Sequence, residues 1–300
     1  MKQGGSNLVR AAASALLTMV FFALIEGGLA LFGGAWSALY SGDPGYDWRV
    51  RPSLNLAAVP HLEEGQPFAV QTNAQGMRDD ALPTTGPWVL ALGCSTTFGW
   101  GVEREHVWTE VLERSLTVPV VNAGVPGHSS EQGLRLAREL IELQPDVVIV
   151  GWGLRDGQHA VVPDVDRKPT PFPRNTRLFR LLAGQLGGEQ TGDTPRVGTL
   201  RFRENIEQTT AIAHAAGARV LLLDMTARSD TPSHGQVLQA LELPLLVPKL
   251  TDEDYFPLDP IHLNERGNRT LAGQLEAPIR VLLTPEVVAP PPEATPQQTP

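Results

Sequence analysis

Residues 88–101 read WVLALGCSTTFGWG, a short apolar run followed by small and polar residues. The apolar part, Trp88–Leu92, ends at Gly93 and is typical of a buried β-strand. The small residues that follow predict a sharp turn from this strand into a helix. Ser95 lies at the turn, where its hydroxyl can face a crevice and where backbone N–H groups can point at an anion.

The rest of the central region alternates between strand and helix patterns. Apolar runs of strand length occur at Val118–Val121, Asp146–Val150, Arg219–Asp224 and, more weakly, Leu243–Val247. Helical spacing of apolar residues occurs over Glu131–Leu143, Leu200–Ala216 and Asn264–Leu283. Because the strands are continuous apolar runs, they are expected to be buried on both faces. The alternation therefore predicts an α/β fold with a parallel sheet and helices on both of its sides.

In such a sheet ligands bind outside the carboxyl ends of the strands, so the residues after each strand are candidates for chemistry. Gly124 follows the second strand, where a glycine leaves its N–H available to a reacting group. Just before the last helix, Asp259 precedes His262 by three residues. On a tight turn, an aspartate so placed can accept from the imidazole Nδ1–H, which leaves the other ring nitrogen to act as a base.

Four short blocks of the sequence resemble the motifs of the SGNH, or GDSL-type, hydrolases and occur in the same order. A serine block lies at 93–99, a glycine follows the second strand at 124, a third block lies at 151–156, and a D-x-x-H block lies at 259–262. The segment TNAQGMRD at 72–79 is also similar to one that precedes the serine block in membrane-anchored members. The resemblance covers roughly residues 70–280. It implies a flavodoxin-like three-layer α/β/α fold with a parallel sheet, and it implies no cofactor.

Residue by residue, the resemblance implies a catalytic set. Ser95 matches the nucleophile, His262 the general base and Asp259 its orienting partner. Gly124 and the backbone N–H of Ser95 match the oxyanion hole. Each residue also has a plainer interpretation: Ser95 can cap the following helix, His262 can be a surface turn histidine, and Asp259 can form an Asx turn before Pro260. The four blocks together favour the catalytic interpretation.

Two positions depart from the family pattern. Cys94 stands where the serine block usually has an aspartate, and Arg155 stands where the third block has the asparagine that donates to the oxyanion. An arginine also donates hydrogen bonds, so Arg155 is a candidate oxyanion donor with a different geometry. Alternatively, Arg155 forms a salt bridge with Asp156 or another acid. Loss of one oxyanion donor costs about 10²–10³ in turnover, so we expect reduced activity or a shifted substrate preference.

These observations leave three hypotheses for function. The first is a serine ester hydrolase that cleaves acyl esters of a lipid or of an O-acylated glycan, as the family resemblance suggests. The second is an acyltransferase on the same scaffold, which passes the acyl group to a polysaccharide hydroxyl. The third is a weakly active or inactive binding module, which the replacement at Arg155 motivates. The intact set of Ser95, His262 and Asp259 argues against the third.

The N-terminal end carries a long apolar segment from Ala11 to Gly34. Its length matches the roughly 20 residues that a helix needs to cross a bilayer, so we expect one transmembrane helix that binds the membrane. Lys2 and Arg10 precede the segment, and this positive charge favours a cytoplasmic N-terminus. The catalytic domain is then expected outside the cytoplasm, in the periplasm or at the cell surface. A cleaved signal peptide is the alternative, although the segment is long for one.

Composition excludes other classes of protein. The 300-residue chain has 24 Lys+Arg against 33 Asp+Glu, a formal net charge of -9, which argues against nucleic-acid binding. The single cysteine excludes an intrachain disulfide, and His128, His159 and His234 lack metal-ligand spacing, so we expect no metal site. We divide the chain into an N-terminal membrane anchor (or signal) at 1–35, a linker and pre-domain segment at 36–85, an SGNH hydrolase domain at 86–283 and a disordered proline-rich tail at 284–300.

Overall fold

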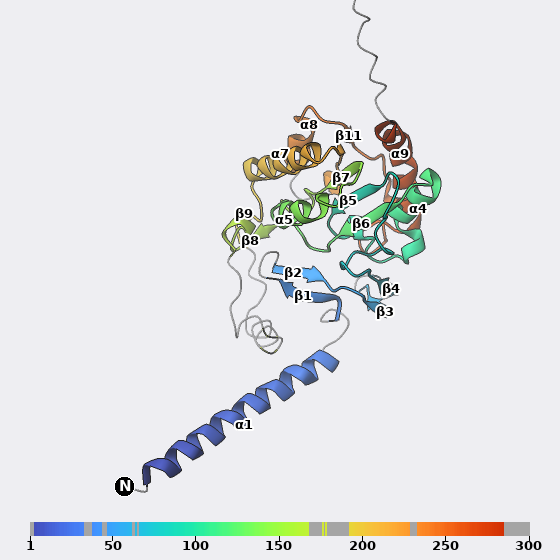
Figure 1. Ribbon diagram of the computed structural model, residues 1–300. Coiled ribbons are helices and arrows are strands. Elements are labelled where there is room, and N and C mark those ends of the chain that lie inside the picture. Colours follow the sequence, from blue (N-terminus) through green and yellow to red (C-terminus); the bar gives the residue numbers. More distant parts are fainter. Residues whose placement is uncertain are drawn as a thin grey trace, which may run out of the picture.

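Five parallel strands form the centre of the molecule in the computed structural model (Figure 1). The structure describes residues 3–32, 38–43, 47–61, 64, 66–167, 176, 178, 192–228 and 233–284. The strands are β5 (Val89–Gly93), β6 (Val120–Gly124), β7 (Val147–Gly151), β10 (Arg219–Leu223) and β11 (Leu245–Leu246). Their order across the sheet is β11-β10-β7-β5-β6. Renumbered along the chain, this is the 2-1-3-4-5 order of flavodoxin-like folds. The predicted fold class is therefore confirmed.

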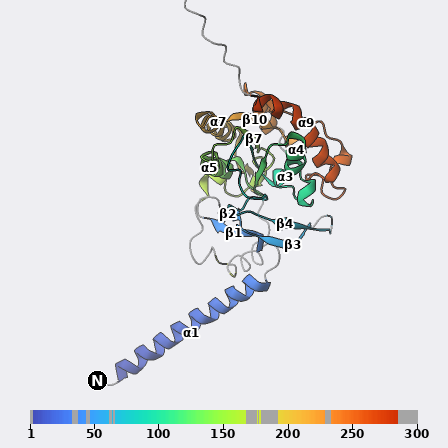
Figure 2. The same cartoon turned by 45° about the vertical axis from the view of Figure 1, so that its right-hand side comes forward.

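Alternate residues of each strand face opposite sides of the sheet, and both sides are buried. In β5, Leu90 and Leu92 belong to the hydrophobic cluster on one side, whereas Val89 and Ala91 belong to the cluster on the other. Helices cover both sides of the sheet and complete the three layers (Figure 2). They are α5 (Ser130–Ile141) and α7 (Thr199–Ala215) on the first side, and α4 (Trp108–Leu116) and α9 (Glu265–Leu283) on the second.

The predicted elements of the central region are present, with ends that differ by up to three residues. Asn264 caps α9, because its side chain accepts the Gly267 N–H at 3.0 Å. Helix α4 is not among the sequence predictions. It has nine residues, so the helical period repeats too few times to stand out from the surrounding sequence.

Two short antiparallel hairpins precede the sheet and lie on the side of the domain that faces the N-terminal helix (Figures 1 and 2). In the first, β1 (Tyr40–Asp43) pairs with β2 (Asp47–Val50), and in the second, β3 (Asn55–Pro60) pairs with β4 (Pro67–Gln71). Buried residues of both hairpins join the hydrophobic cluster of the sheet. The described part of the segment 36–85, which we expected to be a linker and pre-domain segment, thus packs onto the domain.

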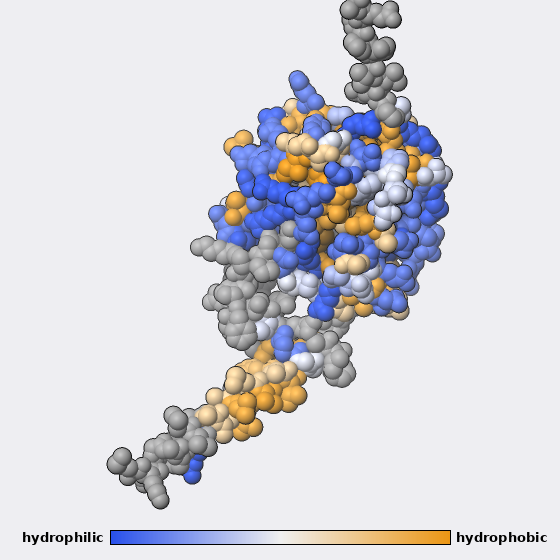
Figure 3. Space-filling model, in the orientation of Figure 1, coloured by the Kyte–Doolittle hydropathy of each residue, from blue (hydrophilic) through white to orange (hydrophobic). Residues whose placement is uncertain are grey.

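The N-terminal helix α1 (Gln3–Phe32) extends away from the sheet and its helices (Figure 1). Its window Ala12–Leu29 has a mean hydropathy of 1.8, and none of this window is buried. Figure 3 shows hydrophobic residues covering the described part of the helix. The helix is long and apolar enough to cross a membrane, a property that a membrane anchor and a signal sequence share.

Short elements complete the described chain. They are α3 (Ser95–Phe98), η1 (Arg104–His106), β8 (His159–Ala160), η2 (Asp164–Asp166), β9 (Thr194–Pro195), η3 (Thr226–Arg228), α8 (Ser233–Gln239) and η4 (Asp252–Asp254). Strands β8 and β9 pair in an antiparallel manner, which brings the segments on either side of residues 161–193 together. The predicted disordered tail lies outside the described residues from 285 onward.

Candidate active site

Three glycines mark the carboxyl edge of the sheet at one level. In the strand register, Gly93 of β5 pairs with Gly124 of β6 and with Gly151 of β7. A Cβ added to Gly124 would lie 2.8 Å from the carbonyl carbon of Thr97 and closer still to the amide nitrogen of Phe98. Real side chains do not approach backbone atoms this closely, so the glycine is what lets helix α3 lie directly against the end of β6.

Ser95 is the first residue of helix α3, directly after β5. The side chain of this serine is buried, with the residue 2% exposed. Its backbone N–H lies in the first turn of a helix, where no acceptor exists within the helix itself. Gly99 ends the helix after four residues in a left-handed conformation, with φ of 78°. The serine is thus presented at the turn where the sequence predicts it.

Ser95, His262 and Asp259 form one chain of hydrogen bonds. The Ser95 hydroxyl lies 2.8 Å from Nε2 of His262, and Nδ1 of His262 lies 2.5 Å from Oδ2 of Asp259. The other carboxylate oxygen, Oδ1, accepts the backbone N–H groups of Ile261 and His262. These contacts fix the turn before α9 and orient the imidazole, so that Nε2 can take the proton of the serine hydroxyl.

Asp259 is held in its ionised form. Burial alone raises the pKa of this carboxyl, but hydrogen bonds from His262 and His61 and the charge that His262 can carry outweigh burial. The pKa of Asp259 therefore lies well below its usual range. An ionised Asp259 accepts hydrogen bonds only, so Nδ1 of His262 carries the proton and Nε2 faces Ser95 as an acceptor.

His61 is part of this cluster, and the sequence analysis did not single it out. Its Nε2 lies 2.9 Å from Oδ2 of Asp259, the same oxygen that contacts His262. The three side chains each present one ligand atom, and these atoms lie within 4.8 Å of one another, so their spacing is compatible with a metal ion. A metal ion would need the lone pairs of the two ring nitrogens, which carry protons when they donate to Asp259, so metal binding and these hydrogen bonds are alternatives.

Asn122 connects the predicted oxyanion residue to helix α3. The Gly124 N–H donates to Oδ1 of Asn122 at 3.1 Å. The amide of Asn122 donates in turn to the Thr97 carbonyl at 2.8 Å and to Oγ1 of Thr109 at 3.1 Å. Asn122 therefore ties the end of β6 to both α3 and α4. In the sequence Asn122 is simply the residue two positions before Gly124, and nothing there indicates this role.

Arg155 lies half-buried in the loop after β7. Its Nε is buried and has no hydrogen-bond partner among the described residues. Its positive charge acts on Tyr40 of β1, where it partly opposes the rise that burial causes in the pKa of the phenol. Within the described part of the chain, no hydrogen bond or ion pair joins Arg155 to Ser95 or Gly124.

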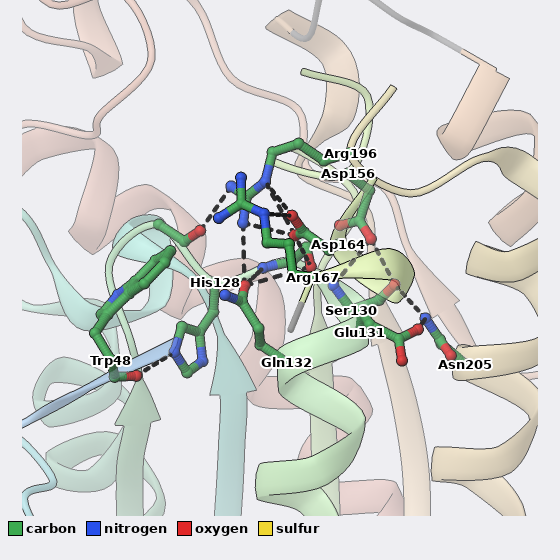
Figure 4. Close-up of polar contacts among 12 residues, drawn as sticks. Trp48, His128, Ser130, Glu131, Gln132, Asp156, Asp164, Arg167, Arg196 and Asn205 are labelled. Atoms are coloured by element: carbon green, nitrogen blue, oxygen red, sulfur yellow. Dashed lines mark hydrogen bonds and ion pairs between the residues drawn. The ribbon is translucent and has the colours of Figure 1, made fainter. Parts of the chain in front are cut away.

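The alternative interpretation of Arg155 was a salt bridge to Asp156 or another acid, but Asp156 forms no ion pair with Arg155. Its Oδ1 accepts the backbone N–H of Ser130 at 2.9 Å and the Ser130 hydroxyl at 2.5 Å (Figure 4). Its Oδ2 accepts the Gly153 N–H at 3.0 Å. Burial raises the pKa of Asp156, and the two hydrogen bonds from Ser130 oppose the rise. Asp156 thus fastens the loop after β7 to the start of α5.

A second buried contact in Figure 4 fixes the loop after β6. The guanidinium of Arg196 forms an ion pair with Asp164 at 2.7 Å and donates to Oε1 of Gln132 at 3.0 Å. It also donates to the carbonyl of Gly127 at 2.8 Å. The loops after β6 and β7, which border the serine, are therefore held by charged groups out of contact with solvent.

The TNAQGMRD segment supports the serine turn from outside the sheet. Arg78 is buried and donates to the carbonyls of Phe98, Gly99 and Val102, at distances from 2.7 to 3.1 Å. Asp79 accepts the backbone N–H of Asn122 at 2.8 Å. Arg78 thus holds the chain just after α3, and Asp79 holds β6. The sequence signal was the segment as a whole, and the contacts show what its last two residues do.

Comparison with known protein families finds a match. The profile of the family described as "GDSL-like Lipase/Acylhydrolase family" matches residues 91–270. No curated protein matches the chain.

Several solved structures are similar to the chain. An esterase, EstA from Pseudoalteromonas sp., is 18% identical, with coverage of 66% of this chain and 99% of that one, and a TM-score of 0.46. TesA is 20% identical, with coverage of 65% and 98%, and a TM-score of 0.45. A GDSL-like lipase from Bacteroides thetaiotaomicron is 17% identical, with coverage of 67% and 92%, and a TM-score of 0.43.

Proposed function

The chain belongs to the GDSL-like lipase/acylhydrolase family of ester hydrolases, and we propose that Ser95, His262 and Asp259 are its catalytic triad. The observation that carries the proposal is the continuous hydrogen-bond chain from the serine hydroxyl through the imidazole to a buried, ionised carboxylate. Each of the three has the donor or acceptor state that nucleophilic catalysis needs.

Acylation begins when Nε2 of His262 takes the proton from the Ser95 hydroxyl and the serine oxygen attacks the ester carbonyl carbon. The electron pair of the carbonyl double bond moves onto its oxygen, which becomes an oxyanion. When the carbonyl double bond re-forms, the bond to the alcohol oxygen breaks, and the imidazolium gives its proton to the departing alkoxide. Asp259 stabilises the imidazolium throughout and stays ionised. A water molecule then repeats the sequence on the acyl-serine and releases the acid.

The oxyanion hole is assigned to the backbone N–H groups of Ser95 and Gly124, with Arg155 as a further donor. The Ser95 N–H lies in the first turn of α3, where the helix itself provides no acceptor. The Gly124 N–H points to Asn122 at 3.1 Å, a long hydrogen bond that it can share with a developing negative charge. Arg155 supports the assignment through its buried Nε, which lacks a partner among the described residues.

The substrate class that we propose is an acyl ester of a lipid or of an O-acylated glycan, with α1 as a membrane anchor and the catalytic domain outside the cytoplasm. Support for the location comes from the apolar helix and from Lys2 and Arg10 at its start. Because Ser95 is 2% exposed, a small acyl group on a good leaving group is the best first probe.

The test uses the full-length protein in detergent and an aryl acetate as substrate. Wild type is expected to hydrolyse it, Ser95→Ala is expected to lose activity by at least about 10³-fold, and Ser115→Ala is the control, since Ser115 is exposed on α4. Equal rates for wild type and Ser95→Ala would refute the nucleophile. A rate that depends on an added glycan acceptor would instead favour an acyltransferase.

A further inference from the structure

We propose that His61 is a positioning residue of the active site, which holds the carboxylate of Asp259 toward His262 by donating its Nε2–H to Oδ2. The inference rests on the proposed function, because it assigns His61 a part in the same triad. His61 lies ahead of residues 91–270, the range that matches the family. It directly follows the hairpin strand β3, so a segment outside the matched range contributes to the reacting site.

Two imidazoles converge on one carboxylate oxygen. Oδ2 of Asp259 lies 2.5 Å from Nδ1 of His262 and 2.9 Å from Nε2 of His61. The two rings stand almost perpendicular, at 79°, with centroids 6.3 Å apart. The other oxygen, Oδ1, accepts two N–H groups that belong to the same turn. His61 is therefore the donor that holds Asp259 from outside its own turn.

A shaped slot holds the ring of His61 in place. The residue is 1% exposed, and its ring stands edge-on to Phe256 at a centroid distance of 4.7 Å. Gly101 lies beneath both rings with φ of 91°. A Cβ on Gly101 would lie 2.7 Å from Nδ1 of His61 and 2.8 Å from the ring of Phe256. The imidazole therefore has little freedom to turn away from Asp259.

Glu64, three residues after His61, also contacts the turn that carries Asp259. Oε1 of Glu64 accepts the backbone N–H of Leu258 at 2.5 Å and that of Asp259 at 3.2 Å. His61 thus contacts the side chain of Asp259 while Glu64 contacts its backbone. Two contacts on one turn from one neighbouring segment are what a positioning role requires, and burial of an isolated histidine does not explain the second of them.

The proton on His61 follows from the state of Asp259. An ionised carboxylate only accepts, so Nε2 of His61 must carry a proton for the hydrogen bond to exist. His61 has no hydrogen bond to Ser95 among the described residues, and its hydrogen bond to the triad is the one to Asp259. Without this donor the carboxylate can rotate away from Nδ1, and the imidazole can then adopt the wrong tautomer or orientation. The expected loss is in kcat, with KM little changed.

The test compares two substitutions of similar length in the full-length protein. His61→Gln keeps an N–H donor at the position of Nε2, whereas His61→Met removes it. His61→Met is expected to lower kcat, and the rate of labelling by a fluorophosphonate, about 10- to 100-fold. His61→Gln is expected to stay within about 3-fold of wild type, since the charge-assisted bond is retained. KM is expected to stay within about 2-fold in both.

Substitutions of His234 provide the matched control. His234 is equally buried, and its Nε2 contacts the carbonyl of Val197 at 2.9 Å, away from the triad. His234→Met is expected to lower the melting temperature without a change in kcat per folded molecule. Equal kcat for wild type and His61→Met, or equal losses in His61→Met and His61→Gln, would overturn the positioning role.

Three further results complete the test. If wild type neither hydrolyses the ester nor takes the label, the proposed function fails rather than the role of His61. If activity disappears with a chelator and returns with Zn²⁺, the cluster is a metal site and the hydrogen-bond role is wrong. Should His61→Met not fold, ¹⁵N-histidine spectra of wild type decide, because an unprotonated Nε2 on His61 contradicts the proposal.

Discussion

Substituting Gly124 by alanine tests how closely the serine helix depends on the end of β6. The added Cβ would lie 2.8 Å from the carbonyl carbon of Thr97 and closer still to the amide nitrogen of Phe98. Carbon atoms in contact prefer about 3.5 Å or more, so α3 must move by about 1 Å. Ser95 is in α3, and its hydroxyl lies 2.8 Å from Nε2 of His262. A shift of that size breaks the hydrogen bond.

The expected cost of Gly124→Ala has two parts. Overpacking against backbone atoms costs about 1–3 kcal/mol in the free energy of unfolding. A misplacement of about 1 Å in the reacting group costs about 10²-fold in rate. Both are measured on full-length protein in detergent, the first by thermal unfolding and the second by the rate of fluorophosphonate labelling.

Gly273→Ala is the control for this substitution. Gly273 is exposed in α9, and an added Cβ there would meet no atom within 4 Å. Alanine is expected to stabilise that helix by up to about 1 kcal/mol and to leave the labelling rate unchanged. A Gly124→Ala protein with the melting temperature and labelling rate of wild type would refute the close packing of α3 on β6.

Three other predictions concern residues around the triad. Arg78→Met removes the guanidinium that donates to the carbonyls of Phe98, Gly99 and Val102, so it is expected to lower the free energy of unfolding by about 3 kcal/mol or more. The exposed Arg138→Met is the control, with an expected loss of about 0.5 kcal/mol or less, and equal melting temperatures for the two variants would contradict the prediction. Burial raises the pKa of Asp79 from 3.8 to about 6, although the Asn122 N–H and the charge of Arg104 oppose the rise. The folded state thus favours the protonated carboxyl, so the stability that Asp79 contributes is complete below pH 4 and falls by about 3 kcal/mol as the pH rises through 6. Asp79→Asn should remove that part of the dependence of the free energy of unfolding on pH, and an unchanged slope of that free energy against pH would count against the prediction. Arg155→Ala is expected to lower kcat by about 10²-fold at an unchanged melting temperature, and Arg155→Asn to lose less; an unchanged kcat for Arg155→Ala would exclude this side chain from the oxyanion hole.

Much of the central fold is readable from the sequence, because parallel strands buried on both faces leave continuous apolar runs. The run before Gly93 and the run before Gly151 mark β5 and β7 to within one residue. The hairpins ahead of the sheet are not readable in this way. Their strands are only four to six residues long, so an alternation such as that of Asp47–Val50 is too short to stand out from the surrounding sequence.

The candidate site divides in the same way. Ser95 and Gly124 lie in short blocks at strand ends, and Asp259 and His262 lie in a block just before α9. The order of these blocks is visible in the sequence. His61 lies in no such block, since its role arises only from the packing of the hairpin against the turn before α9. The contacts of Asn122 with α3 likewise join segments that are far apart in the sequence. The same is true of the contacts of Arg78 with the chain after α3 and of Asp79 with β6.

The central claim is that one buried serine, activated by one histidine, carries the chemistry. The most direct measurement treats full-length protein with a fluorophosphonate and locates the modified residue by mass spectrometry of its peptides. The account predicts a single phosphonylated residue, Ser95, and no labelling in His262→Ala under the same conditions. Label on any other residue, or undiminished labelling of Ser95 in His262→Ala, would contradict it.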